Sequence, residues 1–288
     1  MEYVLHLVVI LGIYAILGLS LNLVVGYTGL LSIAHGAFFG IGAYASAILL
    51  ESYGWNFLPA LIASVSVTMV IAALIGFVLS KFRGDYYALA SLGFSVIAYA
   101  VFLNWRSLTG GAFGITGIDR PELFGMTFTP GISYTLLIIT VVAIVYLLCQ
   151  FITESSFGRV LKAIREDEEA IEVFGYKTTL FKLAIFVTSA GFAALAGSLF
   201  ASYVSFISPG AFVDMVSIYI VVIVILGGLA SHDGALLGAA VYILLPELLR
   251  FVGLPDSIAG HARQAIYGLG LILLMFYRPQ GILGKFRL

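Results

Sequence analysis

The stretch Glu154 to Lys182, ESSFGRVLKAIREDEEAIEVFGYKTTLFK, decides how the rest of the chain is read, because it is a long polar segment in an apolar sequence. It carries 11 charged side chains in 29 residues, whereas charged residues make up 10% of the whole chain. Apolar residues recur in it at intervals of three and four, which predicts an amphipathic helix on the water side of a membrane. Ser155 or Ser156 can cap its start, and Gly175 can end it. The apolar stripe consists of Phe157, Val160, Leu161, Ile164, Ile171 and Phe174.

The rest of the sequence is too apolar for a soluble protein. Hydrophobic residues make up 61% of its 288 residues, and the mean hydropathy is +1.11. A soluble domain cannot bury this much apolar surface, so the composition indicates an all-α polytopic membrane protein. A spanning helix needs roughly 20 apolar residues, so residues 1–288 hold about eight to ten spans in a single transmembrane domain. The net charge of −1 gives no reason to expect a nucleic-acid partner.

Hydropathy places nine spans, at residues 4–25, 34–52, 57–80, 86–104, 132–152, 180–204, 212–229, 234–252 and 262–278. Basic residues gather in three of the connections, which indicates that these connections are cytoplasmic. These basic residues are Lys81 and Arg83, then Arg159, Lys162, Arg165, Lys177 and Lys182, and finally Arg278, Lys285 and Arg287. The polar segment and the C-terminus are then cytoplasmic, and the N-terminus lies outside. A different split of the first two spans would change the N-terminal side alone.

A glycine-rich stretch after the first span, GYTGLLSIAHGAFFGIGAY at residues 26–44, predicts a broken helix. Broken spans occur in membranes where they line a cavity or are buried in protein. Both readings stay open here, and for His35 we favour a hydrogen-bonded packing role over contact with a substrate. A similar pattern, GLASHDGALLGAAVY at residues 228–242, suggests an internal repeat, although both copies have the same orientation in this topology.

The sequence lacks the motifs of common catalytic and ATP-binding sites. It has no P-loop lysine, no H-E-x-x-H and no G-x-S-x-G with triad partners. Its single cysteine, Cys149, excludes an intrachain disulfide and a cysteine-based metal site. We therefore expect a non-enzyme with no catalytic residue, cofactor or metal. A transporter of this kind must receive its energy from a partner, and segment 154–182 is the natural receiver. The alternatives are an interfacial helix without a partner, and an ion-coupled secondary transporter, although such transporters usually keep carboxylates at mid-membrane.

Several long stretches resemble one known family. They are NLVVGYTGLLSIAHGAFFGIGAYASAIL, RGDYYALASLGFS, NWRSLTGGAFGITGI, GRVLKAIREDEEAIEVFGYKTTLFKLAIFVTSAGFAALAGSLFA, SYVSFISPGAF and VVIVILGGLASHDGALLGAAVYILLPELLR. In this order they resemble the inner-membrane permease of branched-chain amino-acid ABC transporters, and among its two permease subunits the M-type. One departure is SHDG, where family members often have a serine, an apolar or aromatic residue and a glycine.

The resemblance implies a large-permease importer fold of about ten spans. It implies transport of leucine, isoleucine and valine across the inner membrane, with urea or short amides as alternative cargo. The implied partners are a paralogous H-type permease subunit, two cytoplasmic ATP-binding subunits and an extracytoplasmic solute-binding protein, all assembled in membrane lipid. The cytoplasmic coupling loop would be residues 154–179. Its ATPase-coupling positions are Gly158, Arg159, Ala163, Ile164, Arg165, Glu166, Asp167, Ala170 and Gly175.

The expected substrate-pathway residues carry scattered polar groups rather than a deep charge, because a zwitterion needs several hydrogen-bond partners on its way across the membrane. They are Asn22, Gly29, Ser32, His35, Gly36 and Ser91.

Overall fold

The computed structural model describes residues 2–123 and 126–251, followed by the short pieces 265–266, 268–270, 272, 276–277 and 280–284. Most of the ninth expected span, 262–278, therefore lies outside the described residues. In the described part, six helices are long and apolar enough to cross a membrane, which confirms an all-α, multi-pass membrane protein. They are α1 (Glu2–Thr28), α3 (Phe57–Leu79), α4 (Asp85–Asn104), α6 (Ile132–Glu154), α9 (Thr178–Val204), and α10 (Asp214–Gly227) with the 3-10 turn η2 (Pro209–Phe212) before it.

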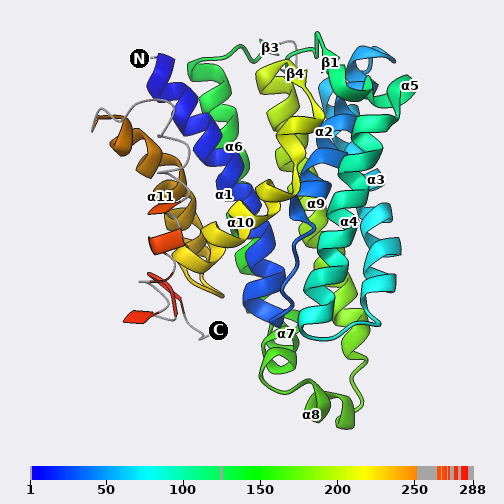
Figure 1. The fold of residues 1–288 in the computed structure, drawn as a ribbon, viewed down its shortest axis with the longest axis vertical. Coiled ribbons are helices and arrows are strands. Elements are labelled where there is room, and N and C mark those ends of the chain that lie inside the picture. Colours follow the sequence, from blue (N-terminus) through cyan, green and yellow to red (C-terminus); the bar gives the residue numbers. More distant parts are fainter. Residues whose placement is uncertain are drawn as a thin grey trace.

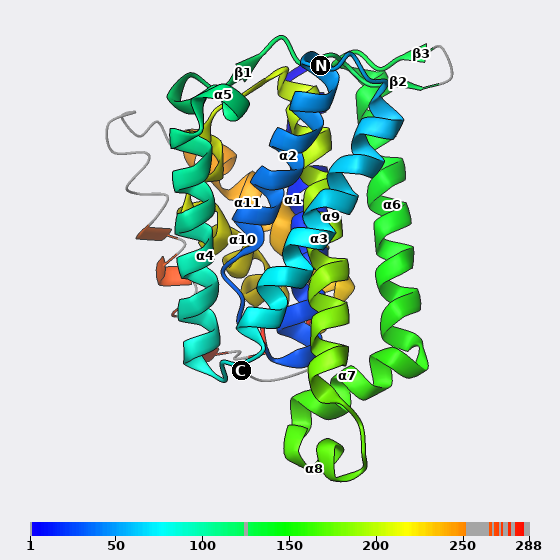
Figure 2. The ribbon, with the colours of Figure 1, turned by 90° about the vertical axis from the view of Figure 1, so that its right-hand side faces the viewer.

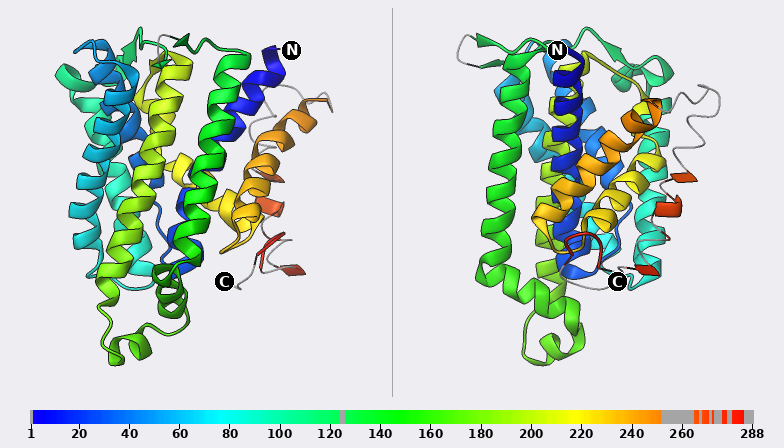
Figure 3. Two further views of the ribbon diagram at one scale, coloured as in Figure 1. Left: turned by 180° about the vertical axis from the view of Figure 1, so that it is seen from behind. Right: turned by 90° about the vertical axis from the view of Figure 1, so that its left-hand side faces the viewer.

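Helix α1 forms the centre of the bundle. Except for the partly buried Tyr14, it is buried from Gly12 to its C-terminal end because α6, α9, α10 and α11 (His232–Phe251) pack around it. Figure 3 shows α11, in orange, beside α10, in yellow, and Figure 1 shows α11 on the side of α1 away from α3 and α4, whereas α10 crosses α1. The small residues of α1 allow this close packing, since a Cβ added at Gly18 would lie 2.9 Å from an Ile223 methyl group.

Two helices are only part of a span. Helix α2 (His35–Glu51) has 17 residues and is roughly 25 Å long, short of the roughly 30 Å of a hydrocarbon core. Helix α1 ends where Gly29 adopts a φ of +72°, and residues 29–34 then carry the chain back into the bundle without helical structure, as Figure 2 shows. Helix α10 has 14 residues and follows a mostly non-helical passage at 205–213. The predicted helix break is thus confirmed.

The structure corrects the spans expected at 34–52 and 212–229, because each crossing is shared between a helix and a non-helical segment. The two half-helices meet by their first turns. The Gly36 amide donates to the Ser217 hydroxyl at 2.8 Å, and that hydroxyl lies 3.5 Å from the hydroxyl of Ser95, near the middle of α4. Both half-helices therefore begin about halfway across the bundle.

The two broken elements run in opposite directions. Helix α1 descends in Figure 1 and α2 returns upward, whereas α9 ascends and α10 returns downward. The two stretches with similar glycine patterns, residues 26–44 and 228–242, lead into α2 and α11, which both run upward in Figure 1. The two units that run in opposite directions are α1 with α2 and α9 with α10, and the glycine pattern of the sequence does not reveal this relationship.

The two ends of the bundle differ in character. One end carries the N-terminus and the long loop after α4, with α5 (Arg106–Thr109), the 3-10 turn η1 (Gly111–Phe113) and two small sheets. Strand β1 (Ile115–Thr116) pairs antiparallel with β4 (Phe206–Ile207), and β2 (Glu122–Leu123) pairs with β3 (Met126–Thr127). The opposite end carries α7 (Ser156–Glu166) and α8 (Glu168–Val173), which project beyond the bundle in Figure 2.

Candidate functional site

The polar segment folds as two short helices rather than the single helix expected from its stripe. Ser155 caps α7 by accepting a hydrogen bond from the Gly158 amide at 3.3 Å, which confirms the predicted start. The helix stops at Asp167, whose extended backbone and side chain cap α8, with the Ala170 amide donating to its carboxylate at 3.0 Å. Gly175, with a φ of +88°, follows the end of α8 as predicted.

The apolar stripe divides between two surfaces. On α7, Leu161 and Ile164 are 0% and 3% exposed and pack against the bundle. A side chain at Gly158 would collide with the backbone of Thr153, so α7 lies tightly under the end of α6. At the end of α8, by contrast, Phe174 is 77% exposed. The segment thus uses one apolar face for its own bundle and leaves a second apolar tip uncovered.

Helix α7 is fastened to the end of α1 by two basic side chains. The Arg165 guanidinium donates to the Gly26 carbonyl, in the last turn of α1. Lys162 lies over the ring of Tyr27, with its ammonium 5.5 Å from the ring centroid. Burial lowers the pKa of Arg165, while the adjacent Glu166 acts in the opposite direction. Arg165 was expected as an ATPase-coupling position, and the structure places its side chain inward, against α1.

The end of α1 is in turn bonded to the turn between α10 and α11. The Tyr27 hydroxyl donates to the Ala230 carbonyl at 3.1 Å, and Thr153 of α6 donates to its own helix at 2.9 Å. His232 Nε2 lies 3.2 Å from the Tyr27 hydroxyl and 3.0 Å from the Thr153 hydroxyl, within hydrogen-bond distance of both. Three helices therefore meet at His232, a residue of the departing SHDG stretch.

Asn22 fixes the same turn from deeper in the bundle. Its amide nitrogen donates to the Ser231 carbonyl at 2.9 Å, and its amide oxygen accepts from the Ala230 amide at 3.0 Å. The side chain is fully buried. Asn22 was expected to face the substrate pathway, and in this conformation both polar atoms bind the α10–α11 turn.

The other expected pathway side chains are also buried in packing contacts. Ser91 accepts from the Ile33 amide at 2.9 Å, which holds the passage between α1 and α2. Ser189 donates to the Ser20 carbonyl at 2.5 Å, so the His35 Nε2 that lies 2.8 Å from its hydroxyl is the donor. Ser32 accepts from a nearby amide at 3.4 Å. Ser32, His35 and Ser91 are each 0% exposed, whereas Gly29 is exposed at the bend and Gly36 lies against α10.

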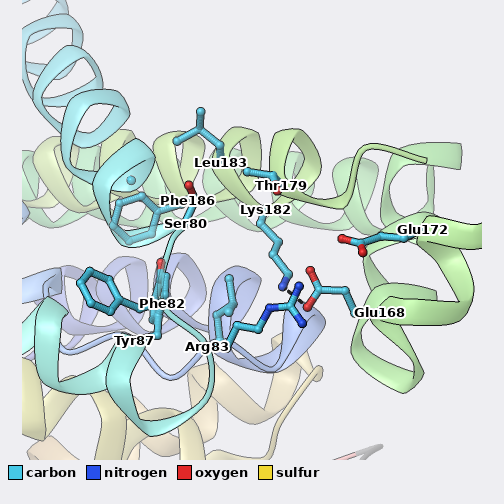
Figure 4. A pocket seen from close by; sticks show the side chains of 12 residues that line it. Ser80, Phe82, Arg83, Tyr87, Glu168, Glu172, Thr179, Lys182, Leu183 and Phe186 are labelled. Atoms are coloured by element: carbon cyan, nitrogen blue, oxygen red, sulfur yellow. Dashed lines mark ion pairs between the residues drawn. The ribbon is translucent and has the colours of Figure 1, made fainter. Parts of the chain in front are cut away.

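An ion pair ties α8 to the base of α9. The Lys182 ammonium pairs with the Glu168 carboxylate, and the Thr178 hydroxyl donates to that carboxylate at 3.0 Å. Arg83, from the connection between α3 and α4, points to the same carboxylate and helps to line a small cavity of about 50 Å³ (Figure 4). Burial alone would raise the pKa of Glu168, but Lys182, Thr178 and Arg83 together lower it.

The remaining expected coupling positions lie on the outer side of these two helices. Arg159, Glu166 and Asp167 are exposed, and Ala163 and Ala170 are half-buried. Arg159 donates to Ser156 at 2.8 Å, within its own helix. The segment therefore presents charged groups and an apolar tip to whatever lies beyond this end of the bundle.

Comparison with known proteins identifies the chain. Residues 3–277 match the family described as branched-chain amino acid transport system, permease component. The chain belongs to this family. The permease is 35% identical to the high-affinity branched-chain amino acid transport system permease protein LivM of Salmonella typhimurium, over 94% of this chain and 68% of that protein.

More distant relatives include both permease types. The permease is 27% identical to the Escherichia coli permease protein LivH, over 94% of this chain and 91% of that protein. It is 25% identical to the probable LivM of Methanocaldococcus jannaschii, over 94% and 90% respectively. No solved structure matches the chain. Within the described residues, no group of three His, Cys, Asp or Glu side chains is placed to hold a metal ion.

Proposed function

We propose that the permease is a membrane subunit of an ABC importer that carries leucine, isoleucine and valine across the inner membrane. The 35% identity to a permease of high-affinity branched-chain amino-acid transport, over 94% of this chain, carries the proposal. The structure adds a physical basis for coupling to an ATPase, because α7 and α8 project beyond the bundle while α7 remains bonded to α1. The ATP-driven work would enter at this end.

The proposed assembly contains this permease, a paralogous H-type permease, two ATP-binding subunits and an extracytoplasmic solute-binding protein. Relatives named LivM and LivH both match over 94% of this chain, which supports a pair of related permeases. The exposed residues of segment 154–179 would contact the ATP-binding subunits, with the Phe174 tip entering an apolar groove and the charges setting the register. The C-terminus would be cytoplasmic, because residues 282 and 283 hydrogen-bond to the C-terminal end of α10, on the α7 side.

Reconstituted transport tests the proposal. Both permeases and the ATP-binding subunits are placed in vesicles with the binding protein and radiolabelled leucine, with or without ATP. We expect leucine uptake that requires ATP and stops when the P-loop lysine of the ATP-binding subunit is replaced. Competition by unlabelled valine, urea and acetamide identifies the cargo. Leucine uptake by the permease alone under an ion gradient would refute the importer and favour a secondary transporter.

The orientation has a separate test. Cys149 is 0% exposed, so its replacement by Ser gives a background for single cysteines. A cysteine at Glu169, exposed on α8, should react with an impermeant maleimide in inside-out vesicles, whereas one at Tyr53, at the opposite end, should react in right-side-out vesicles. The reverse pattern would place the polar segment on the outside of the membrane and would refute its proposed contact with the ATP-binding subunits.

A further inference from the structure

Asp214 is a carboxylate near the middle of the bundle. It is the first residue of α10, and Ser217, one turn further, lies 3.5 Å from Ser95 at the middle of α4. Hydropathy alone places Asp214 at the outer end of a span, because residues 212–229 read as one apolar run. The half-helix instead starts halfway across, and it carries Asp214 to that depth.

The surface around Asp214 is open and partly apolar. Asp214 is exposed, and its neighbours Met215 and Ile218 are 42% and 39% exposed. Ile218 lies four positions after Asp214 and three after Met215, so its side chain is a neighbour of both on the helix surface. Beyond this patch α10 turns inward, since Ile220 and Ile223 are both fully buried. The uncovered part of the half-helix therefore carries the Asp214 carboxylate and two apolar side chains, Met215 and Ile218.

A charged group at this depth needs a counter-charge or water. A carboxylate in hydrocarbon is strongly unfavourable, so such residues face a cavity or another protein surface rather than lipid. The side chain of Asp214 makes no hydrogen bond or ion pair with any described residue. Its negative charge is therefore available to a cation that arrives from outside this chain.

We propose that Asp214 binds the ammonium group of the amino acid as it passes the middle of the membrane, while Met215 and Ile218 contact its branched side chain. The patch matches this cargo in both charge and apolar character, because an ammonium group lies within a few bonds of an aliphatic chain in leucine, isoleucine and valine. The inference rests on the proposed function and adds a substrate contact to it. It replaces the expectation of a pathway without a deep charge.

Leucine uptake by the complete reconstituted importer tests the assignment, with Asp214→Asn and Asp214→Glu compared with the unaltered protein. Loss of the charge should raise the KM for leucine by roughly tenfold or more, because a charge-assisted contact is lost. Asp214→Glu keeps the charge and should recover most of the uptake. The control is Asp85→Asn, the same change at an exposed first-turn position of α4 near the end of the bundle, which should leave the KM unchanged.

One further measurement, the recovery of partner subunits on purification, separates the outcomes. Recovery of the second permease and of the ATP-binding subunits on purification should be the same for Asp214→Asn as for the unaltered protein. Reduced recovery would mean that Asp214 pairs with a neighbouring subunit, and an unchanged KM would mean that it does not contact the cargo; either result overturns the assignment. If the unaltered importer itself takes up no leucine, the proposed function fails, which is a distinct result.

Discussion

Arg165 offers the sharpest test of how movement of α7 reaches the membrane helices. Its guanidinium donates to the Gly26 carbonyl at the end of α1, while Leu161 and Ile164 hold α7 on the bundle independently. Arg165→Met keeps much of the apolar stem and removes the donor. We therefore expect α7 to stay in place but to transmit less of its motion to α1.

The magnitude follows from the contact. A hydrogen bond to a charged group contributes roughly 1.5–3 kcal/mol, and because Arg165 is only half-buried we take about 1 kcal/mol. That corresponds to about a fivefold fall in the coupling between ATP hydrolysis and transport. The assay measures leucine taken up per ATP hydrolysed in vesicles that contain the full importer. The control is Arg106→Met, an exposed arginine at the opposite end of the bundle, which should keep the normal ratio.

Two results would contradict this account. If Arg165→Met retains the normal ratio of leucine to ATP, the bond to Gly26 does not carry the coupling. If the variant loses its ATP-binding subunits on purification, Arg165 belongs to the surface that contacts them, as the resemblance to the family first implied.

Three other predictions concern the same polar segment. Glu168 has a lowered pKa in the folded protein, so its ion pair with Lys182 should stabilise α8 at pH values above the ordinary carboxyl pKa of 4.5. This stabilisation should decrease as the pH falls below 4.5, and faster hydrogen exchange of the α8 amides should report the loss. Glu168→Gln should remove the pH dependence. Gly158→Val should destabilise the protein by roughly 1–3 kcal/mol, measured by thermal unfolding in detergent, because the new side chain collides with Thr153; an unchanged unfolding temperature would refute the tight docking of α7. Phe174→Asp should reduce recovery of the ATP-binding subunits while changing stability by less than about 0.5 kcal/mol, since the ring is 77% exposed, and full recovery would exclude the α8 tip as their contact.

The sequence was sufficient for the class of fold and for the position of the polar segment. Charge density and apolar spacing located α7 and α8, and Ser155 was recognisable as a cap because serine oxygens satisfy the free amides at a helix start. The break at Asp167 was missed because the apolar stripe continues across it. In the sequence, Asp167 is one of several adjacent charged residues and does not stand out as a cap, although its carboxylate caps α8.

The half-helices could not be predicted, because hydropathy reports how apolar a segment is and not how deep it begins. Glycine at position 29 indicated a break, but the depth of α2 and α10 depends on contacts between distant residues, such as Gly36 with Ser217. The same limit applies to the candidate site. The sequence marks His35 as a polar residue near the break, but its partner Ser189 lies 154 residues further along the chain.

The pairing of β1 with β4 has a consequence for the far end of the molecule. It fastens the long loop after α4 to the chain just before η2 and α10, and pairs Ile115 with Ile207 in a short sheet. A protein that displaced this loop would also displace residues 205–213, which lead from β4 to Asp214. In the proposed importer, we therefore expect binding of the loaded solute-binding protein at this loop to displace the start of α10 without movement of α7 or α8.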